Sequence, residues 1–148
     1  MAGGFDPKTF STTPYHKRVE KPWGYEIIYT LDDAPATGKI LHVNAGKRLS
    51  LQYHDVKRET LCLINGEGII TLSNDRDEQV EVPMELYKGY RVTPGQVHRV
   101  TAVTDMDFIE ASTPELGNTF RLEDDSNRQT ETEKIRKTKN RGWSNGSK

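Results

Sequence analysis

The chain has 148 residues, of which 21 are Lys or Arg and 22 are Asp or Glu, so its formal net charge is −1. This length suits one domain that buries roughly two-thirds of the surface of its unfolded chain. The balanced charge gives no reason to expect nucleic acid as the main partner, and no apolar stretch is long enough to span a membrane. We therefore expect neither a nucleic-acid-binding nor a membrane protein.

The two ends of the chain differ from its middle in composition. Residues 1–20 mix Gly, Pro, Ser and Thr without a steady period, and we expect an arm that is loose or lies across another surface. Residues 126–148 hold seven Lys or Arg and two Glu, a net charge of +5. We interpret residues 129–148 as a flexible, solvated tail, with a binding arm as the alternative. Residues 21–128 remain as the folded domain.

Cys62 is the single cysteine of the chain, so no disulfide can form within it, which indicates a reducing compartment. It stands among the apolar residues Leu61, Leu63 and Ile64, where a small buried hydrophobe is the natural interpretation and a nucleophile is not. The first 20 residues lack the continuous apolar run of a signal peptide. We therefore expect a cytoplasmic protein.

Short segments rich in β-branched and aromatic residues recur along the chain between turn residues such as Asn65-Gly66 and Pro94-Gly95. They predict nine strands, over residues 25–30, 38–43, 48–54, 59–64, 67–73, 80–86, 87–93, 97–103 and 106–113. Short strands at this spacing are typical of an all-β sandwich or barrel. A short polar helix is expected only over residues 131–139, and no glycine-rich nucleotide loop is present.

Potential metal ligands gather in residues 46–66, on two predicted strands joined by a short turn. Successive side chains of a strand point to opposite faces, so Gln52 and His54 share one face. Glu59 follows a turn that returns the chain beside the first strand, and His98 comes from a distant strand. Either histidine alone is better explained as a structural residue. Together, amide, imidazole and carboxylate groups suit a divalent ion.

This combination resembles the cupin family, which carries two glycine-bounded motifs with metal ligands. The first motif is filled by Gly46, Gln52, His54, Glu59 and Gly66, with Gln52 where most cupins have His. The second is matched by Gly89, Pro94, Gly95 and His98, although Pro94 abuts Gly95 where the family has one residue between them.

A narrower resemblance covers residues 21–128. Lys-Pro-Trp-Gly at 21–24, the Leu-Ser-Leu-Gln-x-His segment and Arg121-Leu-Glu-Asp-Asp are similar to the type II mannose-6-phosphate isomerase domain, which also occurs behind mannose-1-phosphate guanylyltransferases. The resemblance implies a cupin-type double-stranded β-helix, or jelly-roll barrel, with one bound divalent metal ion. Zinc is the first choice, and manganese, nickel or iron are alternatives. The implied ligands are Gln52, His54, Glu59 and His98.

The resemblance further implies interconversion of mannose 6-phosphate and fructose 6-phosphate through an enediolate, with the metal as Lewis acid and a base that moves the proton. Glu110 is the candidate base, and Lys57 is a second candidate catalytic residue. The candidates for holding the substrate phosphate are Arg48, Lys57, Arg99 and Arg121.

Departures from the family pattern keep other functions open. Asp55 replaces a family His, Lys57 an Arg and Thr60-Leu61 a His-Trp pair, which favours a non-catalytic module that binds a sugar or nucleotide sugar. A dioxygenase that uses iron and oxygen is another alternative, although Gln52 in place of His disfavours it. A nucleotide-sugar epimerase without metal leaves the ligand set unexplained.

The strand faces also predict a partner for the chain itself. Leu49, Leu51 and Tyr53 are expected opposite the ligand face, and Thr60, Cys62 and Ile64 opposite Glu59. A small barrel has few helices to cover such outer apolar faces, so we expect a second copy to do so and the protein to be a homodimer.

Overall fold

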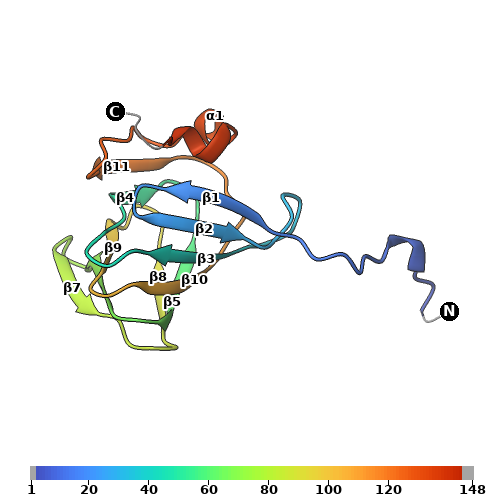
Figure 1. Cartoon of the computed structure of the whole chain (residues 1–148), viewed down its shortest axis with the longest axis horizontal. Helices are drawn as coiled ribbons and strands as arrows, with labels where there is room; N and C mark the ends of the chain where they lie inside the picture. Colours follow the sequence, from blue (N-terminus) through green and yellow to red (C-terminus); the bar gives the residue numbers. More distant parts are fainter. Residues whose placement is uncertain (1–2, 145–148) are drawn as a thin grey trace.

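The computed structural model describes residues 3–144 and shows two antiparallel sheets that face each other (Figure 1). The first sheet has the order β1 (Lys17–Lys21), β2 (Gly24–Ile28), β3 (Thr37–Val43), β10 (Met106–Ser112), β5 (Glu59–Asn65) and β8 (Gly89–Val92). The second has the order β11 (Thr119–Glu123), β4 (Leu51–His54), β9 (His98–Ala102), β6 (Gly68–Ser73) and β7 (Gln79–Pro83). The all-β jelly-roll barrel expected from the sequence is confirmed.

All nine predicted strands are present with shifted ends, and two further strands were missed. β1 pairs with β2 but buries only Val19, so its polar sequence has no visible apolar pattern. β11 pairs with β4, where Phe120 stacks on Tyr53 with ring centroids 4.9 Å apart. The predicted strand over residues 87–93 shrinks to β8, because Tyr87 has φ 65°, outside the range of a strand.

The core lies between the sheets. Its fully buried side chains include Leu63, Ile70, Val100, Met106 and Phe108. The Asn65-Gly66 turn closes one end of the barrel, and a Cβ on Gly66 would lie 2.2 Å from the carbonyl oxygen of Asp105, so only glycine fits.

One of the three apolar residues expected opposite the ligand face lies inside the barrel instead. Leu49 packs against the core, whereas Leu51, which is 5% exposed, and Tyr53, which stacks on Phe120 of β11, alternate with Gln52 and His54 along β4. The prediction was wrong for Leu49 because the strand begins only at Leu51, so strict alternation does not extend back to it. Leu51 and Tyr53 lie on the face opposite the ligands, as expected.

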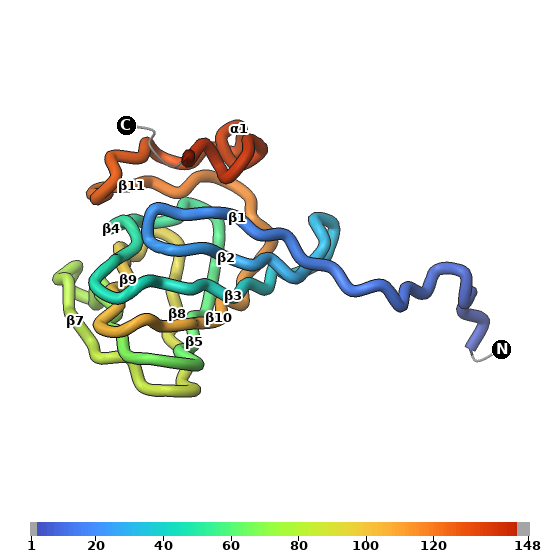
Figure 2. Tube along the Cα trace, viewed as in Figure 1, coloured from blue at the N-terminus to red at the C-terminus, as the bar shows by residue number. Residues whose placement is uncertain are grey.

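The two ends of the chain behave differently (Figures 1 and 2). Residues 3–16, with the short helix η1 (Pro7–Thr9), extend away from the barrel. Residues 124–144 fold back over β11 and include α1 (Glu133–Arg136) and η2 (Lys139–Gly142). Thr132 caps α1 by accepting a hydrogen bond from the backbone N–H of Ile135. Within residues 3–144, no helix is long and apolar enough to cross a membrane.

Candidate metal centre

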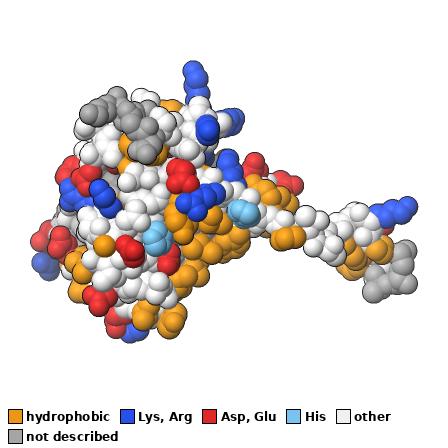
Figure 3. Space-filling view, in the orientation of Figure 1, with side chains coloured by type: hydrophobic (Ala, Val, Ile, Leu, Met, Phe, Trp, Pro, Cys, Tyr) orange, Lys and Arg blue, Asp and Glu red, His pale blue; other side chains and the backbone are white. Residues whose placement is uncertain are grey.

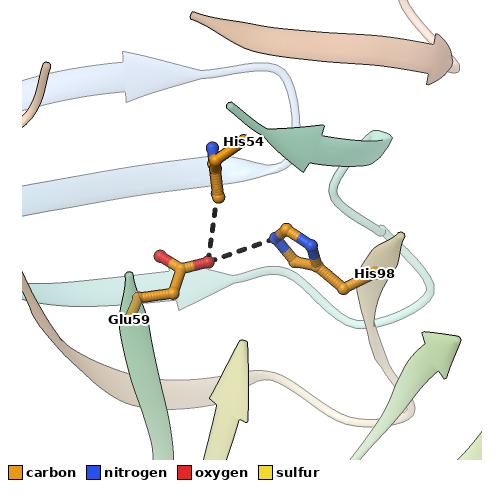
Figure 4. Close-up of side chains that lie close together, drawn as sticks. All are labelled: His54, Glu59 and His98. Atoms are coloured by element: carbon orange, nitrogen blue, oxygen red, sulfur yellow. Dashed lines mark hydrogen bonds and ion pairs between the residues drawn. The ribbon is translucent and has the colours of Figure 1, made fainter. Parts of the chain in front are cut away.

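Three potential ligands converge inside the barrel from three strands (Figure 4). His54 ends β4, Glu59 begins β5 and His98 begins β9. The Nε2 atoms of His54 and His98 each lie 3.1 Å from Glu59 Oε1. The three ligand atoms lie within 4.8 Å of one another, and each side chain is 3% exposed. The geometry therefore offers two imidazoles and one carboxylate to a single point.

Outer hydrogen bonds decide which ring nitrogen of each histidine faces that point. His98 Nδ1 lies 3.0 Å from the carbonyl oxygen of Gln96, which only accepts, so Nδ1 carries the hydrogen. In the neutral ring, Nε2 then presents a lone pair to Glu59 Oε1. His54 Nδ1 lies 2.9 Å from Thr119 Oγ1, a hydroxyl that accepts from Nδ1–H when Nε2 carries the lone pair. Acceptors that face one another need a proton or a cation between them, so this donor set fits a divalent metal.

Burial favours the neutral form of His54. It lowers the pKa of His54 to about 4, more than the hydrogen bond to Glu59 raises it. Burial pushes the pKa of Glu59 upward, but Lys57 and both imidazoles outweigh it, and the pKa lies well below its ordinary range. A carboxylate and a neutral imidazole are the forms that bind a metal ion.

Gln52 lies beside this cluster. It pairs with His98 across β4 and β9, and its Nε2 lies 3.4 Å from His98 Nε2. Its Oε1 accepts a hydrogen bond from the buried hydroxyl of Ser50. Rotating the amide by half a turn would turn its oxygen, the atom that can bind a metal, toward His98. Gln52 therefore stays a prediction for the fourth ligand.

The two predicted catalytic residues lie next to Glu59. Lys57 Nζ is 3.3 Å from Glu59 Oε2 and 3.2 Å from Glu110 Oε2, and both residues are buried. Burial and then the charge of Glu59 raise the pKa of Glu110 to about 7, although Lys57 lowers it. Burial lowers the pKa of Lys57, but Glu110, Glu59 and Glu115 raise it above its ordinary value. The pair thus combines a fixed cation with a carboxyl group that titrates near neutral pH.

The C-terminal segment supplies a second layer of charge. Arg141 reaches in from η2 and lies 2.6 Å from Glu115, 3.4 Å from Glu131 and 3.6 Å from Glu26. Its side chain is 9% exposed. This differs from the flexible, solvated tail that we expected, because residues 129–144 pack on the barrel. Their basic residues find partners that are distant in sequence, which no local pattern reveals.

A small cavity lies between the cluster and this segment. It is lined by Gln52, His54, Lys57, Glu110 and Arg121, among others, and has a volume of about 50 Å³. This volume holds a few water molecules, whereas pockets for drug-sized ligands span roughly 300–1,000 Å³. A sugar phosphate needs more space than the side chains leave in this arrangement.

The remaining predicted residues lie elsewhere. Arg48 is exposed and pairs with Asp125 through two hydrogen bonds of 2.8 and 2.9 Å. Arg99 is buried, and its Nε donates to the carbonyl oxygen of Leu49 at 2.8 Å. Neither lines the cavity described here, whereas Lys57 and Arg121 do. Glu115, Glu131 and Arg141 also line it, and no local sequence pattern marks them as site residues.

No family model matches this chain, and no curated protein sequence matches it. Solved structures do. The capsular polysaccharide assembling protein CapF from Staphylococcus aureus superposes with a TM-score of 0.59 at 16% identity, over 84% of this chain and 33% of that one. Oxalate decarboxylase from Bacillus subtilis superposes with a TM-score of 0.65 at 16% identity, over 77% of this chain and 33% of that one.

This chain has the cupin fold. It spans about a third of the length of these neighbours, and at such identities the likeness shows the fold alone. One of the Bacillus subtilis oxalate decarboxylase structures is described by its Mn(II) centres. In this chain a His-Glu-His metal site at His54, Glu59 and His98 is possible.

Proposed function

We propose that this protein is a metal-dependent aldose–ketose isomerase of a phosphorylated sugar, with mannose 6-phosphate and fructose 6-phosphate as the first pair to test. One observation carries the proposal: the Lys57–Glu110 pair lies directly against Glu59 of the metal cluster. Isomerisation needs a group that both removes and returns a proton, and a carboxyl with a pKa of about 7 suits both directions near neutral pH.

The residues fit a bound divalent ion, which His54, Glu59 and His98 would hold, with Gln52 as the predicted fourth ligand. Such an ion supplies Lewis-acid stabilisation of negative charge on the sugar oxygens. The fold is shared with a capsular polysaccharide assembling protein, which is in keeping with a carbohydrate substrate.

Side chains of the protein would transfer the proton between the two carbon atoms of the sugar. Glu110 would remove it from the carbon next to the carbonyl, giving an enediolate, and return it to the neighbouring carbon. Lys57 keeps one carboxylate oxygen of Glu110 in place at 3.2 Å and balances the charge of the Glu59–Glu110 pair. Their burial excludes bulk water, which would otherwise exchange the proton.

The test combines metal analysis with an isomerase assay of the full chain. We expect Glu110→Gln to lower kcat at least 100-fold while the metal content stays unchanged, because the variant keeps the shape of the side chain and loses the base. Glu81→Gln, an exposed carboxylate on β7, is the matched control. Metal-loaded wild-type protein without turnover of either sugar phosphate would contradict the proposal.

The small cavity favours a second candidate, a sugar-binding module without catalysis. About 50 Å³ of space among paired charged side chains leaves little room for a reacting hexose. This candidate predicts measurable affinity for a sugar or nucleotide sugar, no isomerisation, and the same affinity in Glu110→Gln. Oxygen consumption by iron-loaded protein would support the dioxygenase alternative and count against both.

A further inference from the structure

A second and larger pocket lies where the C-terminal segment meets β11. Its volume is about 380 Å³, and its lining includes Arg121, Arg128, Arg141, Asn127, Gln129 and Trp143. We call it the arginine pocket. No Asp or Glu within residues 3–144 is among its lining residues. Three guanidinium groups, two amides and an indole therefore surround a space that offers hydrogen-bond donors and net positive charge.

The three arginines differ in how their charge is balanced. Arg128 pairs with Asp124 through contacts of 3.1 and 2.9 Å, and Arg141 with Glu115 through contacts of 2.8 and 2.6 Å. Within residues 3–144, no carboxylate lies within ion-pair distance of Arg121. Its Nη1 donates to the carbonyl oxygen of Gln129 at 2.6 Å, and its buried Nε has no hydrogen-bond partner.

An unbalanced, partly buried guanidinium is costly, and its surroundings show this. Burial and then the neighbouring charge of Arg128 lower the pKa of Arg121 to about 10. A bound anion would supply the missing charge. Guanidinium forks bind phosphate oxygens in a bidentate manner, so phosphate fits this group better than a halide ion does.

The same three arginines also line the small cavity beside the metal cluster, so they form the wall between the two spaces. A ligand with its anionic group in the arginine pocket lies across this wall from Lys57 and Glu110, and its remaining atoms reach them once the arginine side chains move aside. We infer that the arginine pocket binds the phosphate group of a phosphorylated sugar, with Arg121 as its main anchor. The sugar part of this inference rests on the proposed function; the phosphate part does not.

The test measures binding of inorganic phosphate and of mannose 6-phosphate to the full chain after metal removal by chelation. Trp143 lines the arginine pocket, whereas Trp23, the other tryptophan, lines the small cavity, so the fluorescence quenching that Trp143→Phe removes is the part that reports the arginine pocket. We expect Arg121→Met to weaken binding of both probes at least 10-fold, and Trp143→Phe to remove the signal. Arg76→Met, in the exposed loop between β6 and β7, is the matched control.

A second variant covers the case in which Arg121→Met does not fold. Arg121→Lys keeps the charge but loses the fork, and we expect roughly 3- to 10-fold weaker binding. No binding by wild-type protein at 10 mM probe, or equal binding by both Arg121 variants and Arg76→Met, overturns the inference.

The outcomes also separate this inference from the proposed function. Phosphate binding that depends on Arg121, in a protein without isomerase activity, keeps the pocket and removes the isomerase. Equal affinity for both probes keeps the phosphate site but contradicts a contribution from the sugar. Isomerase activity that is unaffected in Arg121→Met removes the pocket and keeps the isomerase.

A different observation carries a second inference, about the outer face of the first sheet. Ile27, Ile40, Ile109 and Cys62 are direct register partners across β2, β3, β10 and β5, and all four are partly exposed. Figure 3 shows hydrophobic side chains gathered over β2, β3 and β10. Their neighbours along the strands point inward to the cavity, so this row faces out of the barrel.

The N-terminal arm carries matching groups away from its own barrel. Phe5 is 68% exposed and Phe10 65%, and residues 3–16 extend from the body (Figure 1). An extended chain of this length reaches roughly 45 Å, enough to cross a neighbouring sheet. We propose that a second copy of this chain covers the isoleucine row, with each arm lying on the other copy.

Sedimentation or light scattering of the full chain tests this. We expect a dimer at about 100 μM, a monomer for Ile40→Glu, and at least 10-fold weaker association for Phe5→Ser with Phe10→Ser, which leaves the barrel untouched. Val80→Glu, exposed on β7, is the control. Monomeric wild-type protein, or a dimer that persists unchanged in the arm variant, contradicts the proposal.

Discussion

The two ends of the barrel are filled with opposite kinds of side chain. One end holds a dry apolar core that includes Leu63, Met106 and Phe108, each at most 1% exposed. The other end, only a few residues away along the same strands, holds titratable groups such as Lys57, Glu59 and Glu110. Hydrophobic burial stabilises the first end, whereas burying charge at the second costs free energy that its ion pairs only partly return.

This difference separates the sources of stability and function. Strand β5 contributes to both ends, with Glu59 in the charged cluster and Leu63 in the core. Strand β10 does the same with Glu110 and Phe108. On each strand the buried apolar residue therefore lies only two or four positions from the carboxyl group whose pKa is shifted. A site built on the ends of anchored strands keeps its geometry while its charges change.

The largest effect is expected at the apolar end. Phe108→Ala removes a fully buried ring and should reduce the free energy of unfolding by about 3–5 kcal/mol, through lost burial and the cavity that remains. Urea unfolding monitored by fluorescence measures it. Val103→Ala, 52% exposed, should change stability by less than about 0.5 kcal/mol. A loss below about 1 kcal/mol for Phe108→Ala would show that the core does not anchor the barrel.

The charged end predicts a specific acid sensitivity at Glu26. Burial raises the pKa of this carboxylate, but Lys21, Lys39 and Arg141 outweigh it, and the pKa falls from 4.5 to about 2. Because the folded-state pKa is depressed, the resulting stability is complete above about pH 4.5 and is lost as the pH falls toward 2. The loss is on the order of 3 kcal/mol.

Urea unfolding at several pH values tests this window. Between pH 4.5 and pH 2.5, Glu26→Gln should show a slope of stability against pH that is lower than that of wild type by about 1 kcal/mol per pH unit. Glu81→Gln, with its exposed side chain, should keep the wild-type slope. Equal slopes in all three proteins would mean that the buried ion pairs of Glu26 contribute no net stability.

The contrast between the ends also explains which parts of the site could be predicted from the sequence. Strand alternation placed Gln52 and His54 on one cavity, because a period-2 pattern is a local property. Glu59 joins them from β5, which lies in the opposite sheet and not beside β4 as we expected, and His98 joins them from β9. The docking of Arg141 has no such local origin. Its partners Glu26 and Glu115 lie far away in the sequence, so the composition of its basic segment predicted a solvated tail.

Arg48 shows the same limit on a smaller scale. Its parity with Gln52 suggested that both point into the barrel mouth, but β4 begins only at Leu51. The alternation therefore stops before Arg48, whose guanidinium pairs with Asp125 on the surface. Residue type and spacing predict the ligands of a site better than they predict the loops that cover it.

Metal removal should have a smaller effect than the loss of the core ring. At a metal concentration 100 times the Kd, binding stabilises the folded state by about 2.7 kcal/mol, which raises Tm by several degrees. His98→Ala and Glu59→Gln should lose the metal and this rise, whereas Phe108→Ala should keep the rise despite its lower Tm. Thermal unfolding with and without a chelator, paired with elemental analysis, measures both. Full metal occupancy in His98→Ala would contradict the proposed ligand set.

The smallest effect is expected at Arg48, which belongs to neither end. Its pair with Asp125 is 41% and 55% exposed at the two side chains, and exposed pairs contribute roughly 0–1 kcal/mol. Arg48→Ala should therefore change the urea midpoint very little.

The same variant, Arg48→Ala, decides between two predictions for the substrate phosphate. If phosphate affinity falls in Arg48→Ala and not in Arg121→Met, the sequence-based prediction for Arg48 is correct and the arginine pocket is not the phosphate site. The reverse result places the phosphate at the charged end, where Arg121 has a guanidinium nitrogen without a partner.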